Sequence, residues 1–285
     1  MNKTLDIIEK AKKWGSESDD IRALLLIGSL AGQNKSDDLS DYDISVFCTS
    51  SQKFLEDDQW LPSFGEVAIN EPDQFTFNGN SRHTRLVIFK DGTKVDFAFY
   101  STADLEYILS LKRLPLDYNL GYKILLDKDN LASQLPNPTY EKYSSDKPTQ
   151  QDFTRRVEVF FFEVYHVAKY LSRNDLWLAK FRDWQTKEQL LELIEWHAHS
   201  LHGWDYDTYQ LGKKMESWVE PKVWQSLSGV FGHFDRLDGW KALLSSIDLF
   251  REIGHEFANN LGYTYPEEVD RSISTFVNGL YKANK

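Results

Sequence analysis

Cysteine is almost absent from this sequence: Cys48 is the one cysteine among 285 residues, so no disulfide bond can form within the chain. Paired cysteines are typical of secreted proteins, and a lone cysteine beside apolar neighbours is expected to be a small core residue. The chain also lacks a run of the roughly 20 apolar residues that a membrane-spanning helix needs. Its opening segment, MNKTLDIIEKAKKW, predicts an amphipathic helix rather than a signal peptide. We therefore expect a cytoplasmic protein with no membrane association.

Positive charge is scarce as well. The formal net charge is −11 at pH 7, and both halves are acidic: residues 1–145 hold 16 basic and 23 acidic residues, and residues 146–285 hold 17 and 21. Binding to a polynucleotide depends on cations that neutralise its phosphates, so an acidic surface argues against a nucleic-acid partner. It favours a cationic small molecule instead. No heptad seam stands out, and we expect a monomer.

Two carboxylates one residue apart, Asp41 and Asp43, carry the first chemical signal. Alternate residues of a strand point to opposite faces, so Asp41, Asp43 and Ser45 are predicted to share one face while the residues between them pack on a core. Two carboxylates so close together repel each other unless a cation lies between them. Hard oxygen ligands of this kind suit magnesium.

A third acid, Asp96, lies in a predicted hairpin. Asp91 and Gly92 are the residue pair favoured in a type I′ turn, and apolar-rich strands are expected at 85–89 and 95–100 on either side. Asp96 falls between two apolar residues, where an unpaired carboxylate would be costly to bury. A metal ion or a proton taken up during catalysis would be a natural partner.

Gly28 and Ser29 follow an apolar run, 23–27, that is predicted to be a buried strand. Glycine lets the backbone approach a phosphate closely, and a serine hydroxyl with free backbone N–H groups can hold phosphate oxygens. The order and spacing of these segments predict a site for a divalent metal and a nucleoside triphosphate. The alternative is a polar turn followed by an exposed acidic loop around Asp37 and Asp38.

The combination of these motifs resembles the DNA polymerase β-type nucleotidyltransferase superfamily. Further segments are similar to the aminoglycoside 6-adenylyltransferases, the streptomycin-modifying enzymes of bacteria, and the resemblance runs from about residue 21 to the C-terminus. These segments are 40–45, 58–61, 89–92, 125–129 and 167–174. One departure is Leu30, because the family usually has an arginine directly after the Gly-Ser pair.

The resemblance implies an enzyme that transfers AMP from ATP to a hydroxyl of an aminoglycoside and releases pyrophosphate. Magnesium would bind at Asp41 and Asp43. Asp96 would act either as the general base or as the ligand of a second metal ion, and the resemblance does not choose between these roles. Glu158 or Glu163 in the following helical region is an alternative base, and Glu163 flanks an apolar stripe.

The predicted fold is α+β, with the chain divided near residue 147. Residues 1–146 are expected to form a nucleotidyltransferase domain with a mixed sheet and helices to one side, and residues 147–285 a helical bundle that closes on substrate and nucleotide. Strands are expected near 22–27, 43–48, 65–69, 82–89, 94–100 and 122–126. Helices are expected near 3–14 and 102–112, from 150 onwards, and near 175–202, 207–218, 221–229, 239–261 and 267–282.

Three cations of the helical region, Lys169, Arg173 and Lys180, are predicted to contact the triphosphate. The spacing of four between Lys169 and Arg173 places both on one helix face. Each is also a possible ordinary surface cation.

Aromatic residues of the helical region could hold the adenine or a sugar ring. The candidates are Trp177, Trp184 and Trp196, and we expect Trp177 and Glu163 to contact the substrate. A nearby group, His197, His199 and His202, lacks the i, i+4 spacing of a helical zinc site and is predicted to be polar rather than metal-binding.

Three functions remain open at this point. The first is adenylylation of an aminoglycoside; the second is the same chemistry on another small molecule or a protein side chain. The third is a non-catalytic nucleotide-binding relative. The three clustered acids favour the first two, and the missing arginine favours the third.

Overall fold

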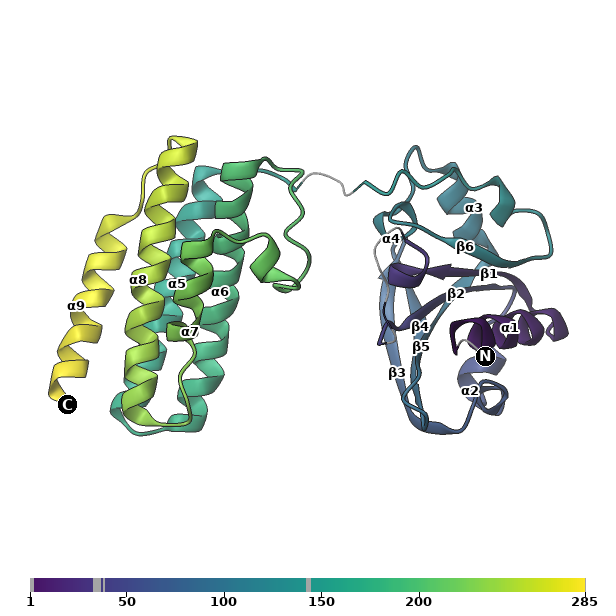
Figure 1. Ribbon diagram of the computed structural model, residues 1–285, viewed down its shortest axis with the longest axis horizontal. Coiled ribbons are helices and arrows are strands. Elements are labelled where there is room, and N and C mark those ends of the chain that lie inside the picture. The colour runs from purple at the N-terminus through teal and green to yellow at the C-terminus, as the bar shows by residue number, and fades with distance from the viewer. Residues whose placement is uncertain (1–2, 33–36, 38, 142–144, 285) are drawn as a thin grey trace. The chain divides into compact units, whose positions relative to one another are not determined.

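A computed structural model describes residues 3–32, 37, 39–141 and 145–284. The chain forms two compact units, Met1–Tyr143 and Ser144–Lys285. The first contains a β-sheet and the second is helical (Figure 1), so the predicted α+β class is confirmed. None of the helices in the described ranges combines the length and apolarity that crossing a membrane requires.

The sheet unit is built on strands that form one mixed sheet in the order β3-β4-β5-β2-β1-β6. Strands β2 and β5 run parallel, and the other neighbouring pairs are antiparallel. The strands are β1 (Ile21–Ile27), β2 (Tyr42–Cys48), β3 (Val67–Phe77), β4 (Asn80–Phe89), β5 (Lys94–Ser101) and β6 (Lys123–Asp127). The helices are α1 (Lys3–Glu17), α2 (Gln52–Glu56), α3 (Thr102–Ser110) and α4 (Leu116–Asn119), with 3₁₀ turns η1 (Gly28–Leu30), η2 (Leu61–Ser63) and η3 (Ala132–Gln134).

Helices cover both faces of this sheet, so the expectation of helices on one side is wrong. Leu24 and Leu26 of β1 pack in the core that includes α1 and α2, whereas Ala23 and Leu25 pack in the core that includes α3 and α4. The physical reason is that the central strands are apolar on both faces and need cover on each. Cys48 ends β2 as a buried core residue, as expected.

The β3–β4 hairpin is much longer than the sequence predicted. Strand β3 continues to Phe77 instead of ending near residue 69. It contains Pro72, which a strand tolerates at the edge of a sheet, and β3 is an edge strand. Asn78 and Gly79 both have positive φ, 47° and 69°, and form the two-residue turn that reverses the chain.

The β4–β5 hairpin is present as predicted, but its turn is not type I′. A type I′ turn needs two residues with positive φ, and here Gly92 has φ 82° while Asp91 is not left-handed. The Gly92 N–H donates to the carbonyl of Phe89, as in a type I turn followed by a glycine bulge. The hairpin therefore still places β5 beside β4.

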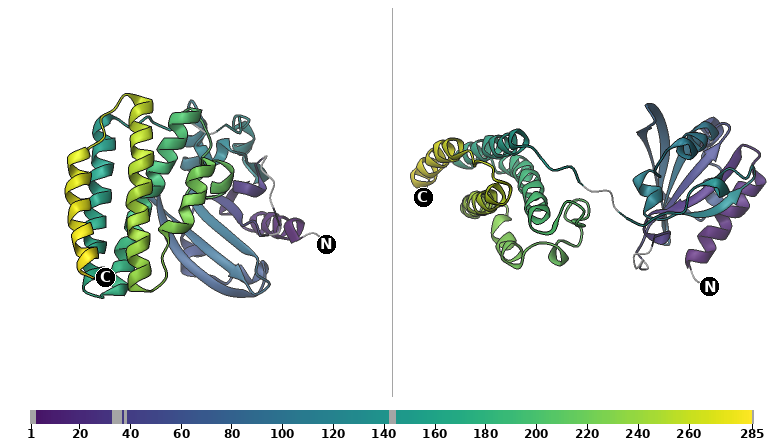
Figure 2. Two further views of the ribbon diagram at one scale, coloured as in Figure 1. Left: turned by 60° about the vertical axis from the view of Figure 1, so that its left-hand side comes forward. Right: turned by 90° about the horizontal axis from the view of Figure 1, so that it is seen from above.

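The helical unit consists of α5 (Gln150–Ser172), α6 (Leu176–His202), α7 (Pro221–Val230), α8 (Arg236–Leu261) and α9 (Glu267–Ala283), with a 3₁₀ turn η4 (Met215–Ser217). Helices α5 and α6 pack together, α8 packs on α6, and α9 packs on α5; the right-hand view of Figure 2 shows them nearly end-on. A reciprocal capping box between Thr149 and Asp152 fixes the start of α5. Apolar residues spaced every three or four along α5 fill the core.

The helix expected at 207–218 is wrong, because only the short 3₁₀ turn Met215–Ser217 forms there. Tyr209, Leu211, Gly212 and Lys214 all have positive φ, between 53° and 72°. A right-handed helix cannot pass through left-handed residues. Periodicity alone gave no sign of this backbone.

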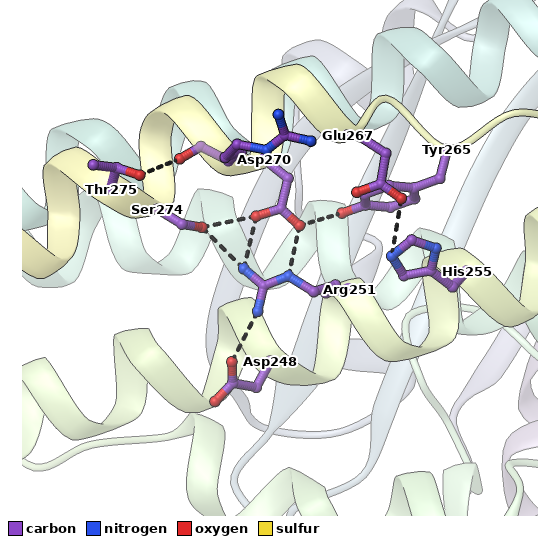
Figure 3. Close-up of polar contacts among 9 residues, drawn as sticks. Asp248, Arg251, His255, Tyr265, Glu267, Asp270, Ser274 and Thr275 are labelled. Atoms are coloured by element: carbon purple, nitrogen blue, oxygen red, sulfur yellow. Dashed lines mark hydrogen bonds and ion pairs between the residues drawn. The ribbon is translucent and has the colours of Figure 1, made fainter.

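A buried ion pair joins α8 to α9 (Figure 3). The Arg251 guanidinium donates two hydrogen bonds to the Asp270 carboxylate, both at 2.7 Å, and Tyr265 and Ser274 donate at 3.0 and 2.8 Å. Burial acts to raise the pKa of Asp270, but the hydrogen bonds from Arg251 and Ser274 outweigh it and the pKa lies below its ordinary value. The network therefore fixes the C-terminal helix.

Candidate active site

The strand register of the sheet unit brings the predicted acids together. Strands β2 and β5 are parallel neighbours, and Asp43 lies directly opposite Asp96. Strand β1 is the other neighbour of β2, and its last residue, Ile27, lies opposite Asp43. Asp41 immediately precedes β2. Residues that are more than 50 positions apart in the sequence thus share one end of the sheet.

Gly28 makes room for this arrangement. Its φ is +72°, and a Cβ atom at this position would lie 2.1 Å from Oδ2 of Asp43. Any other residue would therefore collide with the carboxylate and would also take a strained backbone conformation. Ser29 follows in the short turn η1, whose first carbonyl accepts hydrogen bonds from the N–H groups of Ala31 and Gly32, both at 3.1 Å.

Sequence reasoning missed Lys94, the cation that contacts these acids. Its Nζ atom lies 2.9 Å from Oδ2 of Asp41 and 2.8 Å from Oδ2 of Asp96. The signal was present, because Lys94 precedes Asp96 by two residues and alternate residues of a strand share a face.

Among the described residues, negative charge at the site exceeds the one counter-charge of Lys94. Burial raises the pKa of Asp43 to about 6, and the repulsion from Asp96 adds to the rise, while Lys94 opposes it; Asp41 and Asp117 contribute further repulsion. Asp117, in α4, was also missed by sequence reasoning. Carboxylates that raise one another's pKa favour the binding of an additional cation.

The donors fit a divalent metal by their chemistry, but not in their present arrangement. Oδ1 of Asp96 is buried and has no hydrogen-bond partner among the described residues, so an acceptor is left over for a cation. Across the described ranges, however, no three Asp, Glu, His or Cys side chains converge as a ready-made metal site. The ammonium of Lys94 bridges Asp41 and Asp96, two of the predicted metal ligands.

The surroundings of the acids are partly as expected. Ser45 shares the face of Asp43, but it is fully buried, and its hydroxyl accepts a 3.0 Å hydrogen bond from the hydroxyl of Tyr118. Lys123 donates a 2.7 Å hydrogen bond to the carbonyl of Leu30, so a cation lies beside the turn where the family arginine is missing. Of the alternative acidic loop, Asp37 is exposed and Asp38 lies outside the described residues.

The three cations predicted to contact the triphosphate have different settings in the helical unit. Lys169 lies 4.9 Å above the ring of Tyr165, and Arg173 is the exposed C-cap residue of α5. The ammonium of Lys180 donates a 2.6 Å hydrogen bond to the carbonyl of Gly232. Their role in nucleotide binding stays a prediction.

The two predicted substrate contacts also differ. Glu163 is only 7% exposed, and both of its carboxylate oxygens accept from Arg182 at 3.3 Å. Glu163 is therefore a buried acid that is paired with a cation. Glu158 pairs with Arg155 on the surface. Trp177 is 82% exposed on α6 and is available to a ligand.

The remaining aromatic and histidine candidates have separate partners. Trp184 is exposed, whereas Trp196 is partly buried against the core, under the guanidinium of Arg156. The three histidine side chains face different groups: His197 faces Glu256 at 2.9 Å, His199 faces the carbonyl of Gly203 at 3.2 Å, and His202 faces Glu220 at 3.0 Å.

Comparisons with known proteins point to one family. A family model described as "Streptomycin adenylyltransferase" matches residues 1–280. The aminoglycoside 6-adenylyltransferase of Bacillus subtilis (strain 168) is 28% identical over 271 residues, 92% of each chain. That of Campylobacter jejuni is 30% identical over 263 residues, 90% of this chain and 88% of the relative. Among solved structures, an aminoglycoside 6-adenyltransferase from Bacillus subtilis is 25% identical, covers 97% of both chains and has a TM-score of 0.47.

Proposed function

The chain belongs to the streptomycin adenylyltransferase family and is a nucleotidyltransferase, and from this premise we propose that it transfers AMP from ATP to a hydroxyl group of a streptomycin-like aminoglycoside. The observation that carries the proposal is the pairing of Asp43 with Asp96 across parallel strands. Together with Asp41, these carboxylates hold more negative charge than Lys94 neutralises. That excess suits a metal-bound triphosphate.

In the proposed reaction, the acceptor hydroxyl oxygen bonds to the α-phosphorus, and the bond from that phosphorus to the bridging oxygen breaks. Pyrophosphate leaves with the electron pair of the broken bond. Asp96 accepts the hydroxyl proton, because its Oδ1 has no hydrogen-bond partner among the described residues. Magnesium, held by Asp41, Asp43 and Oδ2 of Asp96, would neutralise charge that develops on the phosphate oxygens. Gly28 leaves room for Asp43, and Ser29 lies where a phosphate would approach.

The chain's own charge supports a cationic acceptor. The net charge of −11 favours a molecule with several positive groups. The exposed indole of Trp177 offers a flat apolar face for a sugar ring. The relatives' names, aminoglycoside 6-adenylyltransferases, support the same class of acceptor.

The direct test is pyrophosphate release with Mg-ATP, measured with and without streptomycin. We expect release that requires streptomycin and that is lost in Asp43→Asn. An exposed control in the same unit, Lys90→Met, should behave as the wild type, because Lys90 pairs with Glu66 on the surface. Streptomycin-independent release, or release that survives Asp43→Asn, would contradict the proposal.

A further inference from the structure

Lys94 contacts the same oxygen atoms that a metal ion would need. Its ammonium bridges Oδ2 of Asp41 and Oδ2 of Asp96, at 2.9 and 2.8 Å. The Lys94 side chain is 32% exposed, so its flexible stem can swing out without breaking the core. The backbone of Lys94 is held in β5 and stays in place.

The charges around Lys94 show why it is positioned there. Asp43 experiences repulsion from Asp96, Asp41 and Asp117, and Lys94 is the cation that opposes it. Carboxylates gathered at such short range need a counter-charge when no metal is bound. An ammonium and a divalent metal cannot both occupy the space between Asp41 and Asp96, so one must leave when the other arrives.

We propose that Lys94 is a displaceable internal counter-ion, which holds Asp41 and Asp96 together before metal binds and moves to the nucleotide polyphosphate when metal takes its place. An ammonium that has lost two carboxylates is attracted to any new anion nearby. In the proposed function, the polyphosphate is the anion that arrives with the metal at the acids that Lys94 contacts. This second half of the inference rests on the proposed function, in which the nucleotide binds at these acids.

A fixed structural clamp is the competing role for Lys94, and it predicts different binding data. We would titrate Mn²⁺ without nucleotide by calorimetry into the wild type, Lys94→Met, Lys94→Arg and the control Lys90→Met. Removing the competing charge should tighten Mn²⁺ binding in Lys94→Met by about tenfold, the order of one charge-assisted hydrogen bond. Lys94→Arg and Lys90→Met should resemble the wild type. Unchanged or weaker Mn²⁺ binding in Lys94→Met would overturn the displacement.

The second arm measures the nucleotide. Binding of the non-hydrolysable analogue α,β-methylene-ATP, in the presence of Mg²⁺, should weaken by about tenfold in Lys94→Met because a phosphate contact is lost. Tighter metal binding and weaker nucleotide binding in one variant is a combination that a clamp does not produce. Nucleotide binding that equals the wild type would overturn the second half of the inference.

A measurement on the wild type keeps the inference testable if Lys94→Met fails to fold. Reductive methylation followed by mass spectrometry reports the exposure of each lysine, with Lys90 as the internal reference. Labelling of Lys94 should rise several-fold when Mn²⁺ is added alone and fall again when α,β-methylene-ATP is added. Labelling of Lys94 that does not respond to Mn²⁺ would overturn the inference.

These outcomes separate the inference from the proposed function. If no acceptor is adenylylated but Lys94 labelling still rises with metal and falls with nucleotide, the proposed transfer fails and the counter-ion role stands. If adenylylation occurs, but Mn²⁺ does not raise the labelling of Lys94 and Lys94→Met does not bind Mn²⁺ more tightly, the counter-ion role fails and the transfer stands.

Discussion

The candidate active site and the core of the helical unit arrange their charged groups in opposite ways. In the helical unit, buried charged groups are paired: Arg251 with Asp270, Lys187 with Asp183, and Glu163 with Arg182. In the sheet unit, Asp41 and Asp96 contact the ammonium of Lys94 and Asp43 lies near it, and among the described residues no second cation is seen to offset the three carboxylates. Ion pairs fix neighbouring helices relative to each other, whereas a cluster of like charges without enough counter-charge is typical of a ligand-binding site.

The largest effect on activity should come from removing one of the clustered carboxylates of the active site. We expect Asp43→Asn to lower kcat/KM by on the order of 10³-fold, because an amide binds magnesium far more weakly than a carboxylate. The folded structure should persist, since the substitution relieves repulsion. Steady-state pyrophosphate release checks the first expectation and circular dichroism the second. Activity within tenfold of the wild type would remove Asp43 from the site.

The raised pKa of Asp43 also predicts how the stability of the protein depends on pH. In the folded protein the pKa of Asp43 is raised to about 6, above the ~4 of an unfolded chain. As pH rises, the carboxyl of the unfolded chain therefore releases its proton before that of the folded protein. The free energy of unfolding of the metal-free protein should fall by about 1–3 kcal/mol between pH about 4 and about 6 and then level off. Urea unfolding in EDTA measures it. A wild type and an Asp43→Asn variant with parallel pH profiles would contradict the raised pKa.

The next effect should come from breaking a paired charge in the helical unit. Asp270→Asn leaves Arg251 half-buried and without its main partner, and should cost about 3 kcal/mol of unfolding free energy. The pKa of Asp270 is lowered in the folded protein. The loss of unfolding free energy in Asp270→Asn should therefore be greatest above pH ~4 and become smaller as the pH falls below that value. Asp248→Asn, which removes an exposed partner of Arg251, should change stability by less than about 0.5 kcal/mol. Equal losses in the two variants would contradict this account.

Two glycines with nearly equal φ sharpen the comparison further. Gly28 and Gly79 have φ +72° and +69°, but a Cβ on Gly28 would strike Asp43 while a Cβ on Gly79 meets nothing within 4 Å. Gly79→Ala should cost about 1 kcal/mol of stability and leave turnover unchanged. Gly28→Ala should cost about 2 kcal/mol and also lower kcat/KM by about 10–100-fold. Equal turnover in the two variants would show that Gly28 does not position Asp43.

The sequence predicted much of the sheet unit because its signals are local. Alternation along β2 and β5 placed Asp43 and Asp96 on the correct faces, and the turn residues predicted the β4–β5 hairpin. The residues that were missed depend on tertiary contacts: Lys94 matters only because β2 lies beside β5, and Asp117 only because α4 packs near Asp43. In the helical unit, sequence spacing could not reveal that Glu163 is paired with a residue of the next helix.

The smallest effect should come from the exposed face of the helical unit. Trp177 is 82% exposed, so Trp177→Ala should change the unfolding free energy by less than about 0.5 kcal/mol. If the indole stacks on the acceptor, the KM for streptomycin should rise by about fivefold while the KM for ATP stays constant. Phe234→Ala, at a similarly exposed position on the same unit, serves as the control. An unchanged KM for streptomycin would remove Trp177 from the acceptor site.

The central claim is that the clustered carboxylates of the sheet unit carry out adenylyl transfer, whereas the ion pairs of the helical unit stabilise the fold. Mass spectrometry of streptomycin after incubation with Mg-ATP tests it, using wild type, Asp43→Asn and Asp270→Asn at a temperature at which all three are folded. The account predicts that the wild type and Asp270→Asn form the AMP adduct at similar rates and that Asp43→Asn forms it on the order of 10³-fold more slowly. Adduct formation by Asp43→Asn within tenfold of the wild-type rate, or no adduct from a wild type that binds ATP, would contradict it.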